Sequence, residues 1–235
     1  MKHVILLGDG MADFPLDVLG GKTPLEYAHT PHMDRIAAEG TQGLIDTIPE
    51  GLPPGSDVAN LAVLGYDPRG CYTGRGPLEA ANMGITLSPE DVAFRCNLVT
   101  LDNSAEPVME DFTAGHISSN EAKRIINDLA NEIGSETFSF YPGVGYRHLL
   151  VWKGGESEIQ VTPPHDITGK AVALYLPQGQ GADQINRLMN LSREFLVNHP
   201  VNKERKERGL KPATSIWLWG QGRAPQIRKM VERFQ

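Results

Sequence analysis

Pro53-Pro54-Gly55-Ser56-Asp57-Val58-Ala59-Asn60 joins a proline-paired loop to an apolar pattern of helical spacing, which continues at Leu61, Ala62 and Leu64. The pattern predicts that Ser56 lies at a helix N-terminus. Helix-start N–H groups lack intrahelical partners and carry partial positive charge, so a phosphate or an alkoxide is stabilised there. Ser56 could therefore be a nucleophile, or only a cap, because Ser and Asp are ordinary N-cap residues.

Gly8-Asp9-Gly10 ends a short apolar run over residues 3–7 that reads as a strand. The Asp9 carboxylate is then expected at the carboxyl end of this strand, the edge at which open α/β sheets bind ligands. An aspartate between two glycines is also a common turn device. Neither Asp9 nor Ser56 identifies a site without the other.

The first part of the chain alternates between strand and helix patterns. Thr30-Pro31 predicts the start of a helix that ends at Gly40, and residues 43–48 form the next apolar strand candidate before the Ser56 loop. Strand, helix, strand, loop and helix in this order are typical of an α/β fold with a doubly wound sheet. Further helices are expected from Pro77 to Gly84 and from residue 227 onward.

The middle of the chain has a different pattern. A capping box at Ser118-Ser119-Asn120-Glu121 predicts a helix that runs to Gly134. Strands are expected at 92–101, 138–140, 148–152, 159–161, 171–176 and 214–219, and a further helix at 184–197. Residues 203–208 alternate in charge and predict a solvated helix end. Together these patterns predict a small α+β unit inserted into the core.

Several arginines and histidines lie in loops, where ligand contacts are common. Arg75 is expected in the loop after the Ser56 helix, where a guanidinium could bind a phosphate oxygen, and Arg223 follows the last strand. The other candidates lie beside glycines or prolines; they are His116, Arg147, His148 and His165. Taken singly, the pattern around each of them favours a structural or solvated side chain.

Composition excludes several classes of function. The net charge of −7 argues against nonspecific binding to nucleic acid or to an anionic membrane. Two cysteines, Cys71 and Cys96, suggest no disulfide framework. The opening apolar run is too short for a signal peptide or a membrane span, and no later run reaches membrane length. A cytoplasmic protein is expected, with no prediction of its oligomeric state.

Seen together, these motifs resemble those of the archaeal-type cofactor-independent phosphoglycerate mutases, in the alkaline phosphatase superfamily. The resemblance extends over nearly all of the chain, and only the ordered set of motifs is specific. Besides residues 8–13 and 53–68, it rests on residues 23–25, 30–34, 72–80, 111–116, 145–148 and 217–223.

The resemblance implies an alkaline-phosphatase-like core with an inserted lid that closes over a small phosphorylated substrate. The expected divisions are a first part of the core over 1–101, the α+β lid over 102–180, and a return segment over 181–235. A lid excludes water and thereby protects a phosphoenzyme from hydrolysis.

A serine hydroxyl needs a metal or a base to attack phosphorus, because its own pKa is far too high. The resemblance implies two divalent metal ions, usually manganese, with magnesium or zinc as alternatives. One ion would be shared by Asp9 and Ser56, and the family's other ligands come from Asp and His clusters beyond residue 235. Neither Asp111 with His116 nor His165 with Asp166 replaces them, so the chain is expected to be the N-terminal part of a longer enzyme.

The function that follows is interconversion of 3-phosphoglycerate and 2-phosphoglycerate through a phosphoserine at Ser56. Two alternatives remain open. One is a relative with another phosphoryl acceptor, either of the homoserine-kinase-like type or a phosphatase, because all of these would keep Asp9 and Ser56. The other is a catalytically incomplete fragment.

Overall fold

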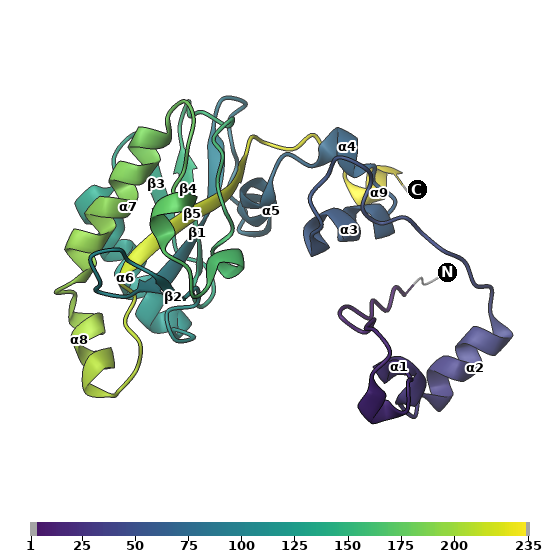
Figure 1. Ribbon diagram of the computed structural model, residues 1–235. Helices are drawn as coiled ribbons and strands as arrows, with labels where there is room; N and C mark the ends of the chain where they lie inside the picture. Colours follow the sequence, from purple (N-terminus) through teal and green to yellow (C-terminus); the bar gives the residue numbers. More distant parts are fainter. Residues whose placement is uncertain (1–3, 234–235) are drawn as a thin grey trace. The chain divides into compact units, whose positions relative to one another are not determined.

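The computed structural model describes residues 4–233, which divide into two compact units, Met1–Asp46 and Thr47–Gln235. In the first unit a 3₁₀ helix spans Asp17–Leu19, and two α-helices follow, α1 (Pro24–Tyr27) and α2 (Pro31–Glu39). Helix α2 begins at Pro31 and its C-cap is Gly40, which confirms the prediction for this helix (Figure 1).

Two strand predictions are wrong. Residue 3 lies outside the described residues, and residues 4–7 and 43–48 form no strand. A strand exists only where a partner takes its backbone hydrogen bonds, and in the described part of the first unit no strand pairs with either segment. The apolar side chains of residues 4–7 are accordingly exposed, Leu6 by 92%, as are Leu44 and Ile45, whereas Ile48 is half-buried.

The second unit is built on an antiparallel sheet. Its strands are β1 (Val92–Leu101), β2 (Met109–Asp111), β3 (Phe138–Tyr141), β4 (Arg147–Trp152) and β5 (Ser215–Gly222). Strand β1 pairs with β4 along one edge and with β5 along the other, and β3 extends the sheet beyond β4. Arg95 lies opposite Leu149 and Trp219 in this register, and Asn97 lies opposite Arg147 and Trp217.

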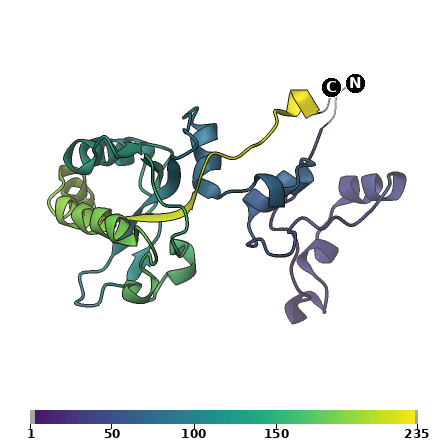
Figure 2. The ribbon, with the colours of Figure 1, turned by 90° about the horizontal axis from the view of Figure 1, so that it is seen from above.

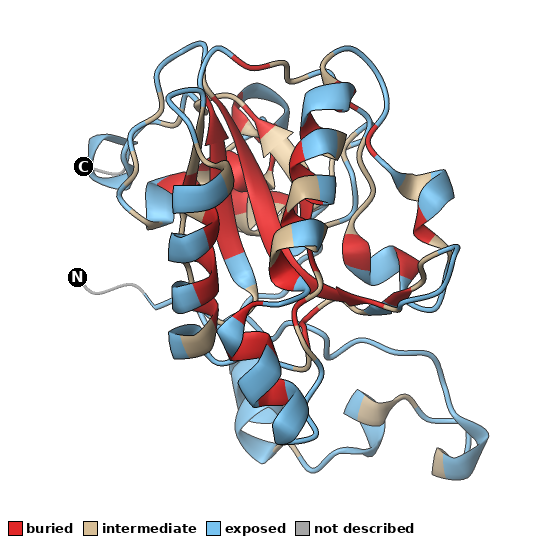
Figure 3. Ribbon diagram, turned by 90° about the vertical axis from the view of Figure 1, so that its left-hand side faces the viewer, coloured by how far each residue is buried: buried red, intermediate tan, exposed pale blue. Residues whose placement is uncertain are grey.

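Helices cover both faces of this sheet. Phe94, Cys96 and Leu98 of β1 pack in one cluster with residues of α6 (Ser119–Ile133) and α7 (Ala182–Leu196). Seen from above, α6 and α7 lie together on one side of the sheet (Figure 2). Ala93 points to the other face, where it packs against Ala80 of α5 (Arg75–Asn82). Strands β1, β4 and β5 are mostly buried; Figure 3 shows the buried parts of the strands in red.

Two glycines allow α5 to approach the sheet closely. A Cβ on Gly76 would lie 2.2 Å from the carbonyl oxygen of Ala93 on β1. A Cβ on Gly74, whose φ is 148°, would lie 2.1 Å from the carbonyl oxygen of Gln221 on β5. Any larger residue would push the start of α5, and Arg75 with it, away from these strands.

The other elements of this unit are short. The α-helices are α3 (Ser56–Val63), α4 (Pro68–Cys71), α8 (Pro200–Glu207) and α9 (Met230–Arg233), and 3₁₀ helices span Pro164–Ile167 and Val172–Tyr175. The expected helix from 227 onward thus begins only at Met230. Within the described residues, no helix combines the length and the apolarity that crossing a membrane requires.

Most of the expected elements of this unit are confirmed, including the capping box, which Ser118 and Glu121 form at the start of α6. The predictions of strands at 159–161 and 171–176 are wrong. Gln160 and Ala171 form only isolated bridges, and Val172–Tyr175 is a 3₁₀ helix. Prolines at 163 and 177 bound these short segments and cannot donate to a sheet.

The α/β class is confirmed. The three-part division at 101/102 and 180/181 stays a prediction, and both boundaries fall within the second unit, whose sheet takes strands from each expected part.

The prediction of a solvated helix end at 203–208 is wrong for one residue. Arg205 is buried, and its Nη1 donates to Glu121 Oε2 at 2.9 Å, while exposed Arg208 donates to the other oxygen of the same carboxylate. Alternating charge in the sequence does not show which side of a helix faces the protein. Here the side that carries Arg205 packs against α6.

We expect Leu129→Ala to destabilise the chain by about 2 to 5 kcal/mol, because it would leave a cavity between α6 and the sheet. Urea unfolding followed by circular dichroism measures the change. Lys123→Ala on the exposed side of α6 is the control and should change the unfolding free energy by less than about 0.5 kcal/mol. Equal effects of the two substitutions would contradict this packing.

A second prediction concerns pH. Burial favours a higher pKa for Glu121, but hydrogen bonds from Ser118 and the charges of Arg205 and Arg208 outweigh it and lower the pKa below 4.5. Because the folded pKa is lowered, the stabilisation is complete above the unfolded pKa and is lost as the pH falls through the folded pKa. Glu121→Gln should therefore cost about 1 to 3 kcal/mol at pH 7 and progressively less in acid. Thermal melts between pH 7 and pH 3 test this, with Glu132→Gln on exposed α6 surface as control; an equal cost at both ends of the range would contradict it.

Candidate functional site

Ser56 is the first residue of α3 and is exposed, as the sequence predicted. Gly55 is the N-cap, and its carbonyl accepts the first helical hydrogen bond from Ala59, at 3.0 Å. Val58 and Leu61 anchor the helix because their side chains are buried. The hydroxyl of Ser56 thus lies where helix-start N–H groups can stabilise negative charge.

Asp57, the second half of the Ser-Asp pair, is tied to the following loop. Its Oδ2 accepts a hydrogen bond of 2.7 Å from the hydroxyl of Tyr72. Burial, together with this hydrogen bond, raises the pKa of Tyr72 well above its ordinary value, so Tyr72 stays a donor. The contact fixes the first turn of α3 against the segment that leads to Arg75.

Asp9 lies in the first unit, in an exposed turn with Gly10 at a φ of 71°. The turn is not preceded by the strand that the sequence suggested. Asp9 and Ser56 therefore belong to different units of the structure.

A cluster of aromatic and cationic side chains forms around Trp219 of β5; we call it the Trp219 cluster. The guanidinium carbon of Arg75 lies 5.5 Å from the centroid of the Trp219 ring, and that of Arg95 lies 5.8 Å from it. The ring of His165 contacts the same indole edge-on, with centroids 5.4 Å apart. Arginine over an aromatic face is favourable because the ring quadrupole attracts the cation.

The cluster continues through two further aromatic rings. Phe112 lies 6.0 Å from the ring of His165 and 5.9 Å from that of Tyr146. The guanidinium carbon of Arg147 in turn lies 5.6 Å from the centroid of the Tyr146 ring. Arg75, Arg147 and His165, expected from widely separated loops, are thus linked by ring contacts. Arg75, however, is the first residue of α5 and not a loop residue.

Asn97 of β1 connects two members of the cluster. Its Oδ1 accepts a hydrogen bond from the indole Nε1 of Trp219 at 3.2 Å, and its Nδ2 donates to the carbonyl of Phe112 at 3.4 Å. Asn97 is buried, so these bonds form away from water. The amide therefore fixes the Trp219 ring relative to the segment that begins at Phe112.

Arg95 is a member of the cluster that the sequence reasoning missed. It is 3% exposed and forms an ion pair with Glu79 of α5. Burial lowers the pKa of Arg95, Glu79 acts to raise it, and the charges of Arg75 and Arg147 lower it further. Its Nε is buried without a hydrogen-bond partner among the described residues.

Three guanidinium groups therefore act on one another here, with the carboxylate of Glu79 paired to one of them. This excess of positive charge favours an anionic ligand. The signal in the sequence was an arginine inside the apolar strand Val92–Leu101, because an arginine is almost never buried there without a partner.

The other three candidates lie differently. His148 of β4 is buried, and its Nδ1 accepts a hydrogen bond of 3.0 Å from the N–H of Gly143. Burial, with a smaller effect of Arg95, lowers the pKa of His148 to about 3, so the ring is neutral near pH 7. This geometry makes His148 a support of the turn before β4.

Arg223 donates to two backbone carbonyls, from Nη1 to Glu90 at 2.6 Å and from Nη2 to Gly155 at 2.9 Å. These bonds hold the end of β5 to two loops. His116 is exposed and lies in the loop that follows Phe112. No group of three or more His, Cys, Asp or Glu residues that could hold a metal ion is present within residues 4–233. The two-metal site implied by the resemblance stays a prediction, since it takes only Asp9 and Ser56 from this chain.

Comparisons with known proteins agree on one family. The family of 2,3-bisphosphoglycerate-independent phosphoglycerate mutase matches residues 37–202. A Geobacter sulfurreducens protein named as a probable 2,3-bisphosphoglycerate-independent phosphoglycerate mutase is 55% identical over the whole chain. A Methanosarcina barkeri protein with the same mutase name is 54% identical, again over the whole chain. The chain covers 59% and 58% of these two proteins, so it spans less than two thirds of their length.

A solved structure gives the same result. The cofactor-independent phosphoglycerate mutase from Thermoplasma acidophilum superposes with a TM-score of 0.55 and 28% sequence identity. The match covers 95% of this chain and 59% of that one. The chain belongs to the 2,3-bisphosphoglycerate-independent phosphoglycerate mutase family.

Proposed function

We propose that this chain carries the nucleophile and part of the substrate-binding surface of a phosphoglycerate mutase that interconverts 3-phosphoglycerate and 2-phosphoglycerate. The observation that supports this most is the exposed Ser56 at the first position of α3 in a chain of this family. The substrate carries a phosphate and a carboxylate. The Trp219 cluster, with its excess of guanidinium groups, suits a molecule with two anionic groups.

In the proposed reaction, Ser56 Oγ attacks the phosphorus of 3-phosphoglycerate, and the bond from phosphorus to the substrate's O3 breaks. The serine proton leaves, and the released O3 takes up a proton. The free glycerate turns, and its O2 attacks the phosphoserine, so that 2-phosphoglycerate forms and Ser56 regains its proton. Each transfer develops negative charge on oxygen, which the N–H groups at the start of α3 are placed to stabilise.

Two divalent metal ions, manganese by resemblance, remain a prediction, as does a cytoplasmic location. Asp9 and Ser56 would be the ligands that this chain contributes. Asp9 and Ser56 are too few ligands to complete such a site, and the described residues hold no cluster of three or more His, Cys, Asp or Glu, so we expect the chain alone to show no turnover. Activity should require the part of the relatives that the chain does not match.

The roles of the cationic side chains follow from their exposure. Arg147 is exposed and Arg75 half-buried, so both can reach a ligand, and His165 is exposed beside them. Arg95 is buried and paired with Glu79, and so contributes charge without direct contact. His116 is the further exposed candidate, whereas His148 and Arg223 have the structural contacts given above.

Ser56→Ala should abolish turnover, by at least about a thousand-fold, because no other group in the proposed reaction takes the phosphoryl group. An enolase-coupled assay with added Mn²⁺ measures this. It uses the chain alone and the chain joined to the unmatched part of the Geobacter sulfurreducens relative. Turnover in the joined protein that survives Ser56→Ala would contradict the nucleophile, and no turnover in the joined protein would contradict the mutase assignment.

Arg147→Ala in the joined protein should raise KM for 3-phosphoglycerate by about 10-fold or more, because it removes a charge-assisted hydrogen bond to the substrate. Arg124→Ala is the matched control. Arg124 is also exposed, but it pairs with Glu204 outside the cluster, so KM should not change. Equal effects of the two substitutions would show that the loss is one of net charge and not of a binding contact.

A further inference from the structure

The loop that carries His116 has an unusual backbone. Ala114, Gly115 and His116 are three successive residues in the left-handed region, with φ values of 50°, 64° and 50°. Glycine adopts this conformation freely, but alanine and histidine do so only where the surroundings hold them. A backbone of this kind therefore indicates that specific contacts fix the loop.

Some of these contacts come from within the loop. Asp111 accepts hydrogen bonds from the N–H groups of Thr113 at 2.7 Å and Gly115 at 3.2 Å. The N–H of His116 donates to the hydroxyl of Thr113 at 3.0 Å. These bonds satisfy the N–H groups of Thr113, Gly115 and His116, and the Thr113 carbonyl accepts from the N–H of Ile117. The carbonyls of Ala114 and Gly115 take their donors from another element.

Arg205 of α8 supplies those donors. Its Nη2 donates to the carbonyl of Ala114 at 2.7 Å and to that of Gly115 at 3.3 Å. The same guanidinium donates from Nε to the carbonyl of Lys211 at 2.9 Å and from Nη1 to Glu121. All three of its nitrogens are thus used, and the side chain is buried.

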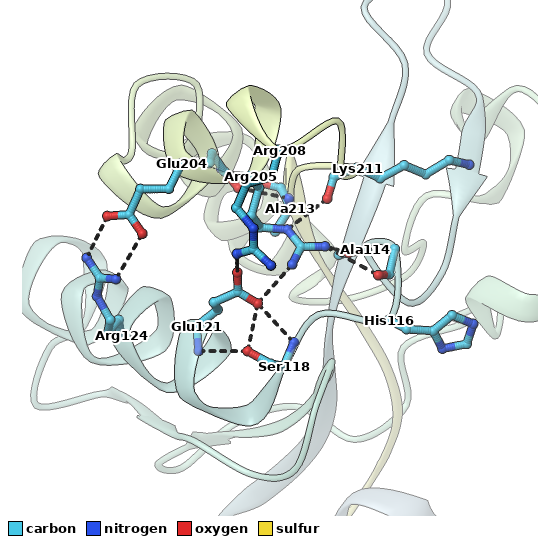
Figure 4. Close-up of polar contacts among 12 residues, drawn as sticks. Ala114, His116, Ser118, Glu121, Arg124, Glu204, Arg205, Arg208, Lys211 and Ala213 are labelled. Carbon is cyan, nitrogen blue, oxygen red and sulfur yellow. Dashed lines mark hydrogen bonds and ion pairs between the residues drawn. The ribbon is translucent and has the colours of Figure 1, made fainter.

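Glu121 holds the guanidinium in place. Its carboxylate also takes part in the capping box with Ser118 and accepts from Arg208, so it is fixed at the start of α6. Figure 4 shows Arg205 between Glu121 on one side and Ala114 on the other, with the imidazole of His116 directed away from this network. The packing is tight, because a Cβ on Gly115 would lie 3.1 Å from Arg205 Nη2.

We propose that Arg205 is a positioning residue for the reaction: by binding the Ala114 and Gly115 carbonyls it holds the loop in its left-handed form and sets the direction of the His116 imidazole. The inference rests on the proposed function in one respect, namely that His116 meets the substrate. Phe112 at the start of the same segment contacts His165 and Tyr146, so a displaced loop would also disturb the Trp219 cluster.

Arg205→Lys tests the inference most cleanly. A lysine keeps the positive charge for Glu121 but has a single nitrogen, which cannot serve Glu121, Lys211 and the loop carbonyls together. Arg208→Ala is the matched control, because Arg208 pairs with the same carboxylate but is exposed. The first readout is NMR of the 235-residue chain, with the signals of residues 113–117 and of the His116 ring compared with those of β1.

We expect Arg205→Lys to shift the loop and His116 signals while those of β1 stay unchanged, and Arg208→Ala to leave both sets unchanged. Unchanged loop signals in a folded Arg205→Lys chain would overturn the proposal. This readout does not depend on turnover, so failure of the proposed function would be seen separately, as inactivity of the joined wild-type protein.

The second readout is a double-substitution cycle in the joined protein. We expect Arg205→Lys to lower kcat by about 10- to 100-fold. Combining it with His116→Ala should add little to the effect of His116→Ala alone, because both remove the same positioned imidazole. Fully additive effects would mean that Arg205 only stabilises the fold, and would overturn the proposal.

Discussion

Strand β1 is hydrogen-bonded along both edges and buried on both faces, and the elements of the second unit are arranged around it. All ten of its residues are buried, so each must be either apolar or paired. The apolar ones form the two packing layers with α5 on one face and with α6 and α7 on the other. Thr100 is polar too and donates to the Pro212 carbonyl, whereas Arg95 and Asn97 connect the sheet to the candidate site.

For the site, the consequence is that part of its positive charge comes from a residue buried in the sheet. Arg95 carries a buried positive charge beneath the Trp219 ring, and the pairing with Glu79 leaves Arg75 and Arg147 to provide the accessible charge. Asn97 fixes the indole that Arg75 covers and, through Phe112, the start of the loop that Arg205 fixes at its other end. Two buried polar residues on different elements, Asn97 and Arg205, thus hold the two ends of the segment from Phe112 to Gly115.

Much of this fold could be predicted from local signals. The capping box of α6, the apolar period of α7 and the mainly apolar strand at 92–101 each specify an element without reference to the rest of the chain. The local pattern alone could not show whether residues 3–7 and 43–48 form strands, because a strand needs a neighbouring strand to pair with and the local pattern says nothing about one. The short runs at 159–161 and 171–176 were misread for the same reason.

The site was predictable in part. Arg75, Arg147 and His165 were found as loop-type candidates, and the position of Ser56 was clear from the helix that follows it. Their contact through Trp219, Phe112 and Tyr146 could not be predicted, because ring contacts between distant segments produce no regular residue spacing in the sequence. Arg205 was misread as a solvated charge, because only the packing of α8 against α6 shows that it is buried.

The central claim is that Ser56 carries the phosphoryl group between the two positions of the glycerate. It is tested most directly by mixing the joined protein with 3-phosphoglycerate and Mn²⁺, quenching with acid within milliseconds to seconds, and mapping phosphate by mass spectrometry. The account predicts one phosphorylated site, Ser56, that forms and decays with turnover. Turnover without phosphate on Ser56, or with phosphate on another residue, would contradict it.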